Sequence, residues 1–367
     1  MKIPFFRYEH VFGQQRDEIL SALLPILERG SFILQRNVLE FESQIAKFVG
    51  AKYAIGTGNA TDALELIIKA AGIGPGDEVI LPSHTFIASA AAIHNNGAIP
   101  ILADIGSDHL VDPASVESLI TPRTKAIMPV QLNGRVCDMD RLGAIASKNG
   151  ILLIEDSSQA LGAKFKGCCA GTFGLAGVFS FYPAKVLGCC GDGGMVITND
   201  DAIAEKIRLL RDHGRSGHGG VVEMWGHNSR LDNIHATIML VKMKRYPQEI
   251  SRRREIAAKY EKNLKQIKKI KLPPAPDSQK EHFDIFQNYE IQAYNRDVLK
   301  EFLANEGIGT IVQWGGKALH QFVNLGFQCH LPNTDKLFHK CLLLPMNTSL
   351  TDEEVDFICS KIQLFYS

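Results

Sequence analysis

Short apolar segments alternate with helix-like patterns between residues 53 and 200. The segment "YAIGTG" (53–58) is followed by Ala63, Leu64, Ile67 and Ile68, which recur at the spacing of one helix face. Strand-like segments such as "ILLIED" (151–156) are apolar at successive positions, as expected where helices cover both faces of a parallel sheet. This order predicts an α/β fold with an open, doubly wound, mostly parallel sheet flanked by helices. Ligands of such sheets bind at the carboxyl ends of the strands.

The last third of the chain has a different pattern. A basic helical stretch from 234 to 268 is interrupted near Pro247, and the turn-rich "LPPAPDSQKEH" (272–282) follows as a candidate linker. A strand at 288–294, a helix at 296–307, a strand at 309–314 and a closing helix at 351–366 then predict a small α+β domain. We expect a large domain at 1–245, including an N-terminal arm, and a small C-terminal domain at 246–367.

Composition excludes several classes of protein. The 40 basic residues balance 40 acidic ones among 367 residues, so no broad positive field is available for binding nucleic acid. No apolar run reaches the length of a membrane span, and the N-terminus lacks an apolar signal segment. The eight cysteines show neither CxxC spacing nor a disulfide framework, which favours reduced thiols and a cytoplasmic protein.

Asp156 stands at the point where the apolar strand "LLIED" stops, and Gln159 follows three residues later. A carboxylate there can remain ionised and pair with a protonated ring nitrogen, while the amide can bond a ring oxygen. The alternative is that Asp156 only caps the next helix. Taken alone, this motif favours the alternative.

Two further segments suggest an anion site. "GTGNATDALEL" places small residues and Thr61 between a strand and a helix, where backbone amides and a hydroxyl attract a phosphate. An ordinary N-terminal cap would give the same pattern. In "FSFYPAK", period-two alternation makes Ser180 a polar interruption of an apolar strand, and it is a candidate second contact to that anion.

Lys185 follows the end of that strand and precedes the glycine-rich turn "GCCGDGG". An amine in a partly desolvated pocket loses its proton more readily and becomes a nucleophile or base. A solvated loop lysine is the commoner alternative. A phosphate site, a pyridinium-pairing acid, a ring-oxygen amide and a reactive lysine together are what pyridoxal 5′-phosphate (PLP) requires.

Nearly the whole chain resembles the DegT/StrS nucleotide-sugar aminotransferase family, within the aspartate-aminotransferase-like PLP fold type I. The similar segments include "GNATDALELIIKAAGIGPGDEVILPSHTFIASAAAI", "IEDSSQALGAKFKG", "FSFYPAKVLGCCGDGGMVITND" and "GHNSRLDNIHATIMLVKMK". The resemblance implies that Lys185 is the Schiff-base lysine, which also moves the proton between cofactor and substrate carbons. It further implies that Asp156 pairs with the pyridine nitrogen and that Gln159 lies beside the ring hydroxyl.

The remaining cofactor contacts are also implied by this resemblance. Thr61, the amide of Ala60, and Ser180 match phosphate contacts, and Phe86 matches the aromatic residue that stacks on the cofactor ring. Asn228, with Arg230 close by, matches a residue that reaches the phosphate from the neighbouring subunit. We therefore expect a homodimer with shared active sites.

Departures from the family pattern concern the substrate pocket and the turn beside the lysine. The chain has "QWGGKALHQ" where relatives commonly have "H-x-P-x-H", so Gln313, Trp314 and His320 are expected to contact the substrate. His84 in "SHTFIAS" and Arg230 in "GHNSRLD" are also expected to contact it. Cys189 and Cys190 have no family role that we can assign. We expect both to be small buried residues rather than metal ligands, and no metal site is predicted.

The resemblance implies transfer of an amino group from L-glutamate to C3 or C4 of a nucleotide-linked 6-deoxy keto-sugar, with a slight preference for C3. The product would be an amino-deoxysugar nucleotide for surface glycans or antibiotic sugars, which includes lipopolysaccharide or O-antigen biosynthesis. One alternative is a sugar dehydratase-type relative that uses the amine form of the cofactor, but such enzymes replace the lysine with histidine. The other alternative is a non-catalytic, sugar-responsive regulator on the same fold.

Overall fold

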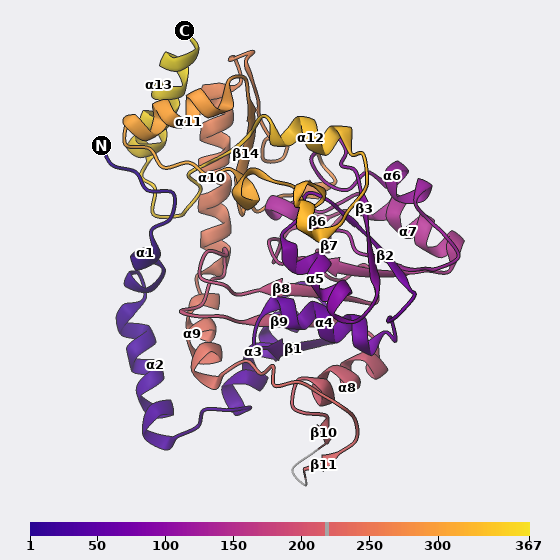
Figure 1. Cartoon of the computed structure of the whole chain (residues 1–367). Coiled ribbons are helices and arrows are strands. Elements are labelled where there is room, and N and C mark those ends of the chain that lie inside the picture. Colours follow the sequence, from indigo (N-terminus) through magenta and orange to yellow (C-terminus); the bar gives the residue numbers. More distant parts are fainter. Residues whose placement is uncertain (217–219) are drawn as a thin grey trace.

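Seven strands form the central sheet of the computed structural model, which describes residues 1–216 and 220–367 (Figure 1). In spatial order the strands are β1 (Tyr53–Thr57), β9 (Gly194–Thr198), β8 (Ala176–Ser180), β5 (Leu152–Asp156), β4 (Thr124–Ile127), β2 (Glu78–Pro82) and β3 (Ile99–Ala103). The strands from β8 to β3 run parallel, whereas β9 pairs antiparallel with both β8 and β1. The predicted α/β fold with a mostly parallel sheet is confirmed.

Helices cover both faces of this sheet because successive strand residues point to opposite sides. On β8, Val178 packs into the core on one face and Phe179 into the core on the other. The first core includes α4 (Ala60–Ala70), α5 (Ile87–Asn95) and α8 (Asp201–Leu210). The second includes α2 (Arg16–Arg29), α3 (Arg36–Val49), α7 (Met139–Asn149) and α9 (Asn233–Met243).

A second, antiparallel sheet follows in the order β12 (Ile270–Lys271), β14 (Tyr289–Ala293) and β15 (Cys341–Leu344). Its core also contains residues of α10 (Tyr246–Leu264), α11 (Arg296–Asn305) and α13 (Asp352–Tyr366). Helix α10 belongs to both parts, since Tyr246 packs into a core of the central sheet and Tyr260 into that of the small sheet (Figure 1). The domain boundary at 245/246 stays a prediction.

Short elements complete the chain. They are α1 (Tyr8–Gly13), α6 (Pro113–Ser118), α12 (Pro332–Phe338), β6 (Lys164–Phe165), β7 (Cys168–Cys169), β10 (Arg215–Ser216), β11 (Val221–Val222), β13 (His282–Phe283) and the 3-10 turns η1 (Leu132–Gly134), η2 (Gln313–Gly316), η3 (Leu319–Gln321) and η4 (Val323–Leu325). None of the helices in the described part of the chain is long and apolar enough to cross a bilayer.

The predicted strand at 309–314 is wrong. Ile311 makes an isolated bridge with Leu343, but the backbone then turns through left-handed conformations at Trp314 (φ 54°) and Gly315 (φ 68°). These conformations end strand pairing and produce the tight turn η2 instead. The turn brings the side chains of Gln313 and Trp314 to a cavity at the ends of β5 and β8, which is named the main cavity because it is bordered by Lys185 and Asp156.

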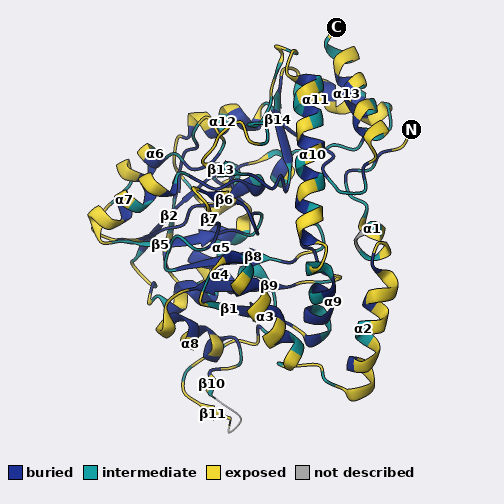
Figure 2. Cartoon of the chain, turned by 180° about the vertical axis from the view of Figure 1, so that it is seen from behind, coloured by how far each residue is buried: buried dark blue, intermediate teal, exposed yellow. Residues whose placement is uncertain are grey.

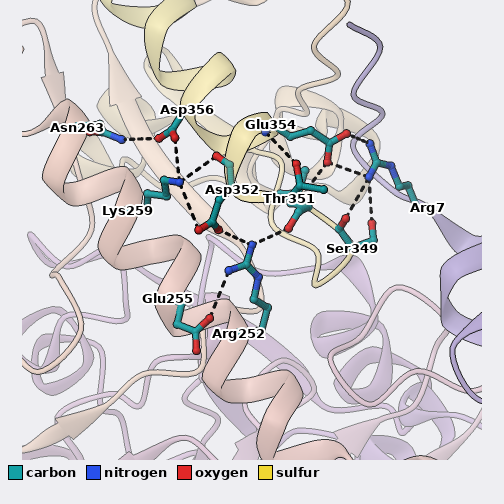
Figure 3. Close-up of polar contacts among 11 residues, drawn as sticks. Arg7, Arg252, Glu255, Lys259, Asn263, Ser349, Thr351, Asp352, Glu354 and Asp356 are labelled. Carbon is teal, nitrogen blue, oxygen red and sulfur yellow. Dashed lines mark hydrogen bonds and ion pairs between the residues drawn. The ribbon is translucent and has the colours of Figure 1, made fainter.

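The N-terminal arm is fastened to the C-terminal helix. Figure 3 shows Arg7 between Ser349 and Glu354, and its guanidinium donates to the Ser349 carbonyl at 3.2 Å and to Glu354 Oε2 at 3.1 Å. Thr351 caps α13 and shares Glu354 in a capping box. The anchored arm places Phe5 and Phe6 against the main cavity.

Candidate active site

The main cavity has a volume of about 510 Å³ and lies where β5 and β8 end and α4 begins. This is the carboxyl edge of the parallel strands, where ligands of such sheets bind. Most of the predicted site residues border it: Ala60, Thr61, Phe86, Asp156, Gln159, Ser180, Lys185, Gln313 and Trp314. The cavity therefore brings together side chains that are far apart in the sequence.

Lys185 enters the cavity from the loop between β8 and β9. Its backbone N–H donates to the Tyr182 carbonyl at 2.8 Å, which closes a turn around Pro183. The side chain is partly buried. Burial disfavours the charged ammonium and lowers the pKa of Lys185 to about 8, although the negative charge of Asp156 acts in the opposite direction. A substantial fraction of the amine is therefore neutral, and so nucleophilic, near neutral to mildly basic pH.

Asp156 is the last residue of β5, and only 6% of its surface is exposed. Its Oδ2 accepts a hydrogen bond from the Ser89 hydroxyl at 2.7 Å, and its Oδ1 accepts one from the Ser158 backbone N–H at 3.1 Å. A buried carboxylate held by two donors at the edge of a cavity is suited to pairing with a cationic ring nitrogen.

The N-terminus of α4 forms one end of the cavity. Asn59 caps the helix by accepting a hydrogen bond from the Asp62 backbone N–H at 2.8 Å, and Ala60 and Thr61 begin the first turn. Backbone N–H groups of a first helical turn lack intrahelical partners and attract anions. Strand β9 approaches closely here, since a Cβ on Gly194 would lie 2.4 Å from the Asn59 carbonyl carbon. Glycine is therefore required for this approach.

Side-chain amides form one wall of the cavity. Oε1 of Gln159 accepts a hydrogen bond from the Asn133 backbone N–H at 2.8 Å. The Asn133 side-chain oxygen in turn accepts from Asn288 at 2.9 Å and from Gln313 at 2.6 Å. The Gln159 carbonyl oxygen is thereby fixed, which leaves its amide nitrogen as the group able to donate to a ligand.

Phe86 and Trp314 form an aromatic pair on another side of the cavity. Their ring centroids lie 5.5 Å apart at an interplanar angle of 42°, and Phe86 is 53% exposed. Phe86 is the N-cap residue of α5, so its backbone lies outside the helix and its ring is directed by the preceding loop. Exposed aromatic faces beside a cavity are suited to stacking on a planar ligand.

Three of the predicted substrate contacts, His84, His320 and Arg230, lie outside the lining of this cavity. His84 is 1% exposed, and its Nε2 bonds the Gln313 side-chain oxygen at 2.9 Å. His320 bonds the Ser83 hydroxyl through Nδ1 at 2.7 Å and Asp335 through Nε2 at 2.9 Å. His84 is therefore connected to the cavity through Gln313, whereas His320 joins the loop after β2 to helix α12.

Asn228 and Arg230 also lie away from the cavity of their own chain. Asn228 forms an isolated backbone bridge with Asp212, and Arg230 donates to the Asp212 carboxylate at 2.9 Å. Both follow the hairpin of β10 and β11, which extends beyond α8 (Figure 1).

The expectation that Cys189 and Cys190 are both buried is half wrong. Cys189 is buried and its backbone N–H donates to the Phe181 carbonyl at 2.7 Å, whereas Cys190 is exposed. The difference arises because Cys189 packs into a core of the central sheet, with its Sγ 3.9 Å from the His235 carbonyl oxygen, whereas Cys190 lies outside that core. Among the described residues, no group of three or more His, Cys, Asp or Glu side chains is arranged to hold a metal ion.

Sequence reasoning missed Ser89, Asn133, Gln287 and Asn288. Ser89 is an ordinary small residue of an alanine-rich helix, Asn133 lies in the short turn η1, and Gln287 and Asn288 lie in the loop before β14. A period-3.6 projection of α5 from Phe86 would have placed Ser89 on the same face as the cavity. No local signal marks the others, because their partners lie far away in the sequence.

These groups fit PLP. The structure supplies a helix N-terminus for a phosphate, a buried and doubly hydrogen-bonded carboxylate, an exposed aromatic face and a lysine with a lowered pKa around one cavity. Such a set on an α/β sheet defines a PLP-dependent enzyme of fold type I.

Comparisons with known proteins identify the family. The model of the DegT/DnrJ/EryC1/StrS aminotransferase family matches residues 14–363. A "Pleiotropic regulatory protein" of Geobacillus stearothermophilus is 40% identical, over 100% of this chain and 99% of that protein. The UDP-2-acetamido-2-deoxy-3-oxo-D-glucuronate aminotransferase of Pseudomonas aeruginosa is 37% identical, over 98% and 99% respectively. The solved structure of S. venezuelae DesV, in complex with a ketimine intermediate, aligns with a TM-score of 0.95 at 33% identity, covering 100% of this chain and 99% of that one.

The chain belongs to the DegT/DnrJ/EryC1/StrS aminotransferase family. It is an aminotransferase whose cofactor is PLP. The family, the fold class, the enzyme class and the cofactor expected from the sequence are all confirmed.

Proposed function

We propose that this enzyme transfers the amino group of L-glutamate to the keto carbon of a nucleotide-linked 6-deoxy sugar. The observation that carries the proposal is the partly buried Lys185, whose pKa is lowered to about 8, facing the same cavity as the doubly held Asp156. The P. aeruginosa relative is named for a UDP-linked 3-oxo sugar, which favours C3 as the aminated carbon.

In this proposal Lys185 and Asp156 have separate chemical roles at the cofactor. Bound PLP supplies an aldehyde and an electron-withdrawing ring that stabilises negative charge on the adjacent carbon. Lys185 would hold the aldehyde until the amine of the donor displaces it, and the freed neutral amine of Lys185 would then take the proton from the donor carbon and return one to the sugar carbon. Asp156 would keep the ring nitrogen protonated, because a carboxylate favours a nearby cation.

Other residues position the cofactor. The first turn of α4 with Ala60 and Thr61, together with Ser180, would hold the phosphate. The amide nitrogen of Gln159 would donate to the ring hydroxyl, and Phe86 would stack on the ring face. Gln313 and Trp314 contact the sugar, while His84 acts through its hydrogen bond to Gln313 and His320 supports the loop that carries His84.

A homodimer completes the site in this proposal. Leu20, Leu24 and Leu27 on α2 are 45%, 57% and 51% exposed, and their spacing places them on one helix face. Trp225, beside the β10–β11 hairpin, is 91% exposed. Exposed apolar side chains of this kind mark interfaces, and Figure 2 shows α2 with much of its outer surface exposed. In the dimer, Asn228 of one chain reaches the cofactor phosphate of the other, with Arg230 beside it.

The product is an amino-deoxysugar nucleotide for glycan biosynthesis, such as lipopolysaccharide or O-antigen, and the proposed location is the cytoplasm. The test is a panel of keto-sugar nucleotides incubated with enzyme, PLP and glutamate, with mass detection of products. A product heavier than its keto-sugar by about 1 Da, which is the exchange of the keto oxygen for NH₂ and H, supports the proposal. Failure of every sugar, with glutamate unconsumed, would contradict it.

A regulatory role beside the aminotransferase activity is the second candidate, because the relative from G. stearothermophilus carries the name of a regulatory protein. A purely non-catalytic regulator would instead bind PLP without turning over an amino donor. Absorbance separates the two roles: glutamate bleaches the visible-edge band of an aminotransferase and leaves that of a pure sensor unchanged.

A further inference from the structure

The side-chain amide of Gln287 contacts the backbone on both sides of Lys185. Its Nε2 donates to the Ala184 carbonyl at 2.8 Å, and its Oε1 accepts from the Val186 backbone N–H at 2.8 Å. These two groups belong to the peptide units before and after Lys185. Their orientation sets the direction of the lysine Cα–Cβ bond, and hence the region that its amine can reach.

We infer that Gln287 is the positioning residue for the reactive amine of Lys185, which it holds at the cavity by fixing both flanking peptide groups. The inference rests on the proposed role of Lys185. A lysine side chain has several rotatable bonds and loses much rotamer freedom when ordered. A fixed backbone at Lys185 reduces the number of positions that its amine can occupy. A misplacement of about 1 Å at such a group costs on the order of 100-fold in rate.

Gln287 is itself held firmly. It is 6% exposed, and its backbone carbonyl accepts a hydrogen bond from the Arg253 guanidinium at 3.1 Å. The same guanidinium nitrogen also donates to the carbonyls of Phe286 at 3.1 Å and Met346 at 2.8 Å. Helix α10 thus fixes the segment that carries Gln287 just before β14 begins.

A second contact fixes this segment from the side of the central sheet. Gly134 has a φ of +87°, and a Cβ there would lie 2.7 Å from the Gln287 backbone nitrogen. The Gly134 carbonyl accepts from the Ile285 N–H at 2.9 Å. Gln287 therefore lies between α10, the small sheet and the loop after β4. A shift of the small sheet would move Gln287, and with it the backbone on both sides of Lys185.

Gln287 suits this role because only a side-chain amide both donates and accepts at the required places. Gln287→Met keeps the length but removes both hydrogen bonds. Gln287→Glu keeps the acceptor for Val186 but loses the donor to Ala184. We therefore expect Gln287→Met and Gln287→Glu to slow the reaction of Lys185 with PLP. Loss of a single hydrogen bond elsewhere in the protein should not slow it. Tyr260→Phe is the matched control, because it removes one buried hydrogen bond, to the Pro345 carbonyl, within the small-sheet core.

The titratable groups around Lys185 stay the same in Gln287→Met and Tyr260→Phe, so the pH midpoint of these two variants reports on the amine. Gln287→Glu adds a carboxylate, so it is compared by its trapping rate alone. The titratable or charged groups that border the larger cavity with Lys185 are Asp156, Tyr182 and Asp192. Those that border the smaller adjoining cavity with Lys185 are Arg7, Tyr8, His10, Lys242, Tyr246, Glu249 and Arg253. Loss of the two Gln287 hydrogen bonds lets the Lys185 side chain move and gives its amine more access to water. The pKa of Lys185 then moves from its lowered position toward its ordinary value, because less desolvation opposes the charged form.

The experiment traps PLP on the apoprotein with borohydride over time and pH, and measures the label on the Lys185 peptide by mass. We expect trapping in Gln287→Met to be slower by about tenfold or more, with its pH midpoint above that of the unsubstituted enzyme, and kcat to fall more than KM for glutamate rises. Gln287→Glu also slows trapping, which keeps the test available if the Met variant does not fold. Tyr260→Phe lowers thermal stability but changes neither trapping rate nor midpoint.

Two failures are distinguishable. Absence of label on Lys185 in the unsubstituted enzyme would contradict the proposed function itself. Normal labelling there, with the same rate and midpoint in folded Gln287→Met, or the same rate in folded Gln287→Glu, would overturn only the positioning role of Gln287.

Discussion

The Ser89 hydroxyl donates a hydrogen bond to Oδ2 of Asp156 at 2.7 Å, from helix α5 to the end of strand β5. Ser89 in turn exchanges a hydrogen bond with the Thr85 hydroxyl at 2.8 Å, so the carboxylate is oriented by a short chain of hydroxyls. Both Ser89 and Thr85 are buried. The acid that we propose to pair with the cofactor ring is thus fixed before any ligand binds, which reduces the ordering cost of binding.

Ser89→Ala should weaken PLP retention. Loss of one hydrogen bond to a charged acceptor costs about 1.5–3 kcal/mol, which corresponds to tenfold or more in affinity. The measurement is PLP affinity of the apoprotein by fluorescence titration. Ser360→Ala on the outer face of α13, whose hydroxyl donates to the Phe357 carbonyl, is the control. Equal affinity in both variants would show that Ser89 does not support Asp156.

Asp156→Asn should shift the reactivity of Lys185 to lower pH. The lysine pKa of about 8 reflects burial, which lowers it, partly offset by the negative charge of Asp156, which raises it. Removing that charge leaves the lowering effect unopposed, so the folded-state pKa falls below about 8. In the unsubstituted apoprotein, the rate of trapping a small neutral aldehyde on Lys185 rises with pH through about 8. In Asp156→Asn the same rise occurs at lower pH, and an upward shift would contradict this electrostatic account.

Arg211→Met should destabilise the fold. Arg211 pairs with Glu42 inside the protein and also donates to the Gly56 carbonyl at 2.8 Å, at the end of β1. Both side chains of the pair are less than a tenth exposed. The substitution leaves a buried carboxylate without its cation, which typically costs about 3–5 kcal/mol. Urea unfolding measures the loss, and Arg252→Met, which removes a more exposed pair with Asp352 (Figure 3), should cost much less.

Mixed oligomers test the shared site. Lys185→Ala and Asn228→Ala are each expected to have little activity alone, the first through the lost amine and the second through weak phosphate retention. When the two are unfolded and refolded together, hybrids contain one site with both Lys185 and the partner chain's Asn228. Activity above that of either parent is expected. Failure of the mixture to regain activity, with hybrids detected by mass, would place Asn228 outside the active site.

The features that the sequence predicted are local ones. Asp156 and Ser180 end apolar strands and Thr61 begins a helix, and parallel topology brings these positions to one edge of the sheet. Gln287 escaped prediction because its partners, Ala184 and Val186, lie in a different part of the chain, and a buried amide has no periodic signature. Such contacts depend on tertiary packing, which sequence patterns do not specify.

The strand expected at 309–314 failed for a related reason. Its apolar residues fit a strand by pattern, but left-handed backbone at Trp314 and at the two following glycines turns the chain toward the cavity.

His84 was expected to contact the substrate, but its side chain is buried. Its Nε2 lies 3.5 Å from the carboxylate of Glu290 on β14 and is hydrogen-bonded to Gln313, which lies between His84 and the cavity. Glu290 is nearly fully buried, and although burial raises its pKa, His84 and His109 together hold it below its ordinary value.

The central claim is that Lys185 forms the covalent link to the PLP aldehyde. The most direct measurement is borohydride reduction of the PLP-loaded protein, followed by proteolysis and mass mapping of the pyridoxyl group. The account predicts one modified residue, Lys185, and no fixed cofactor in a folded Lys185→Ala variant that has also lost turnover. A pyridoxyl group on another lysine, or normal turnover by Lys185→Ala, would contradict it.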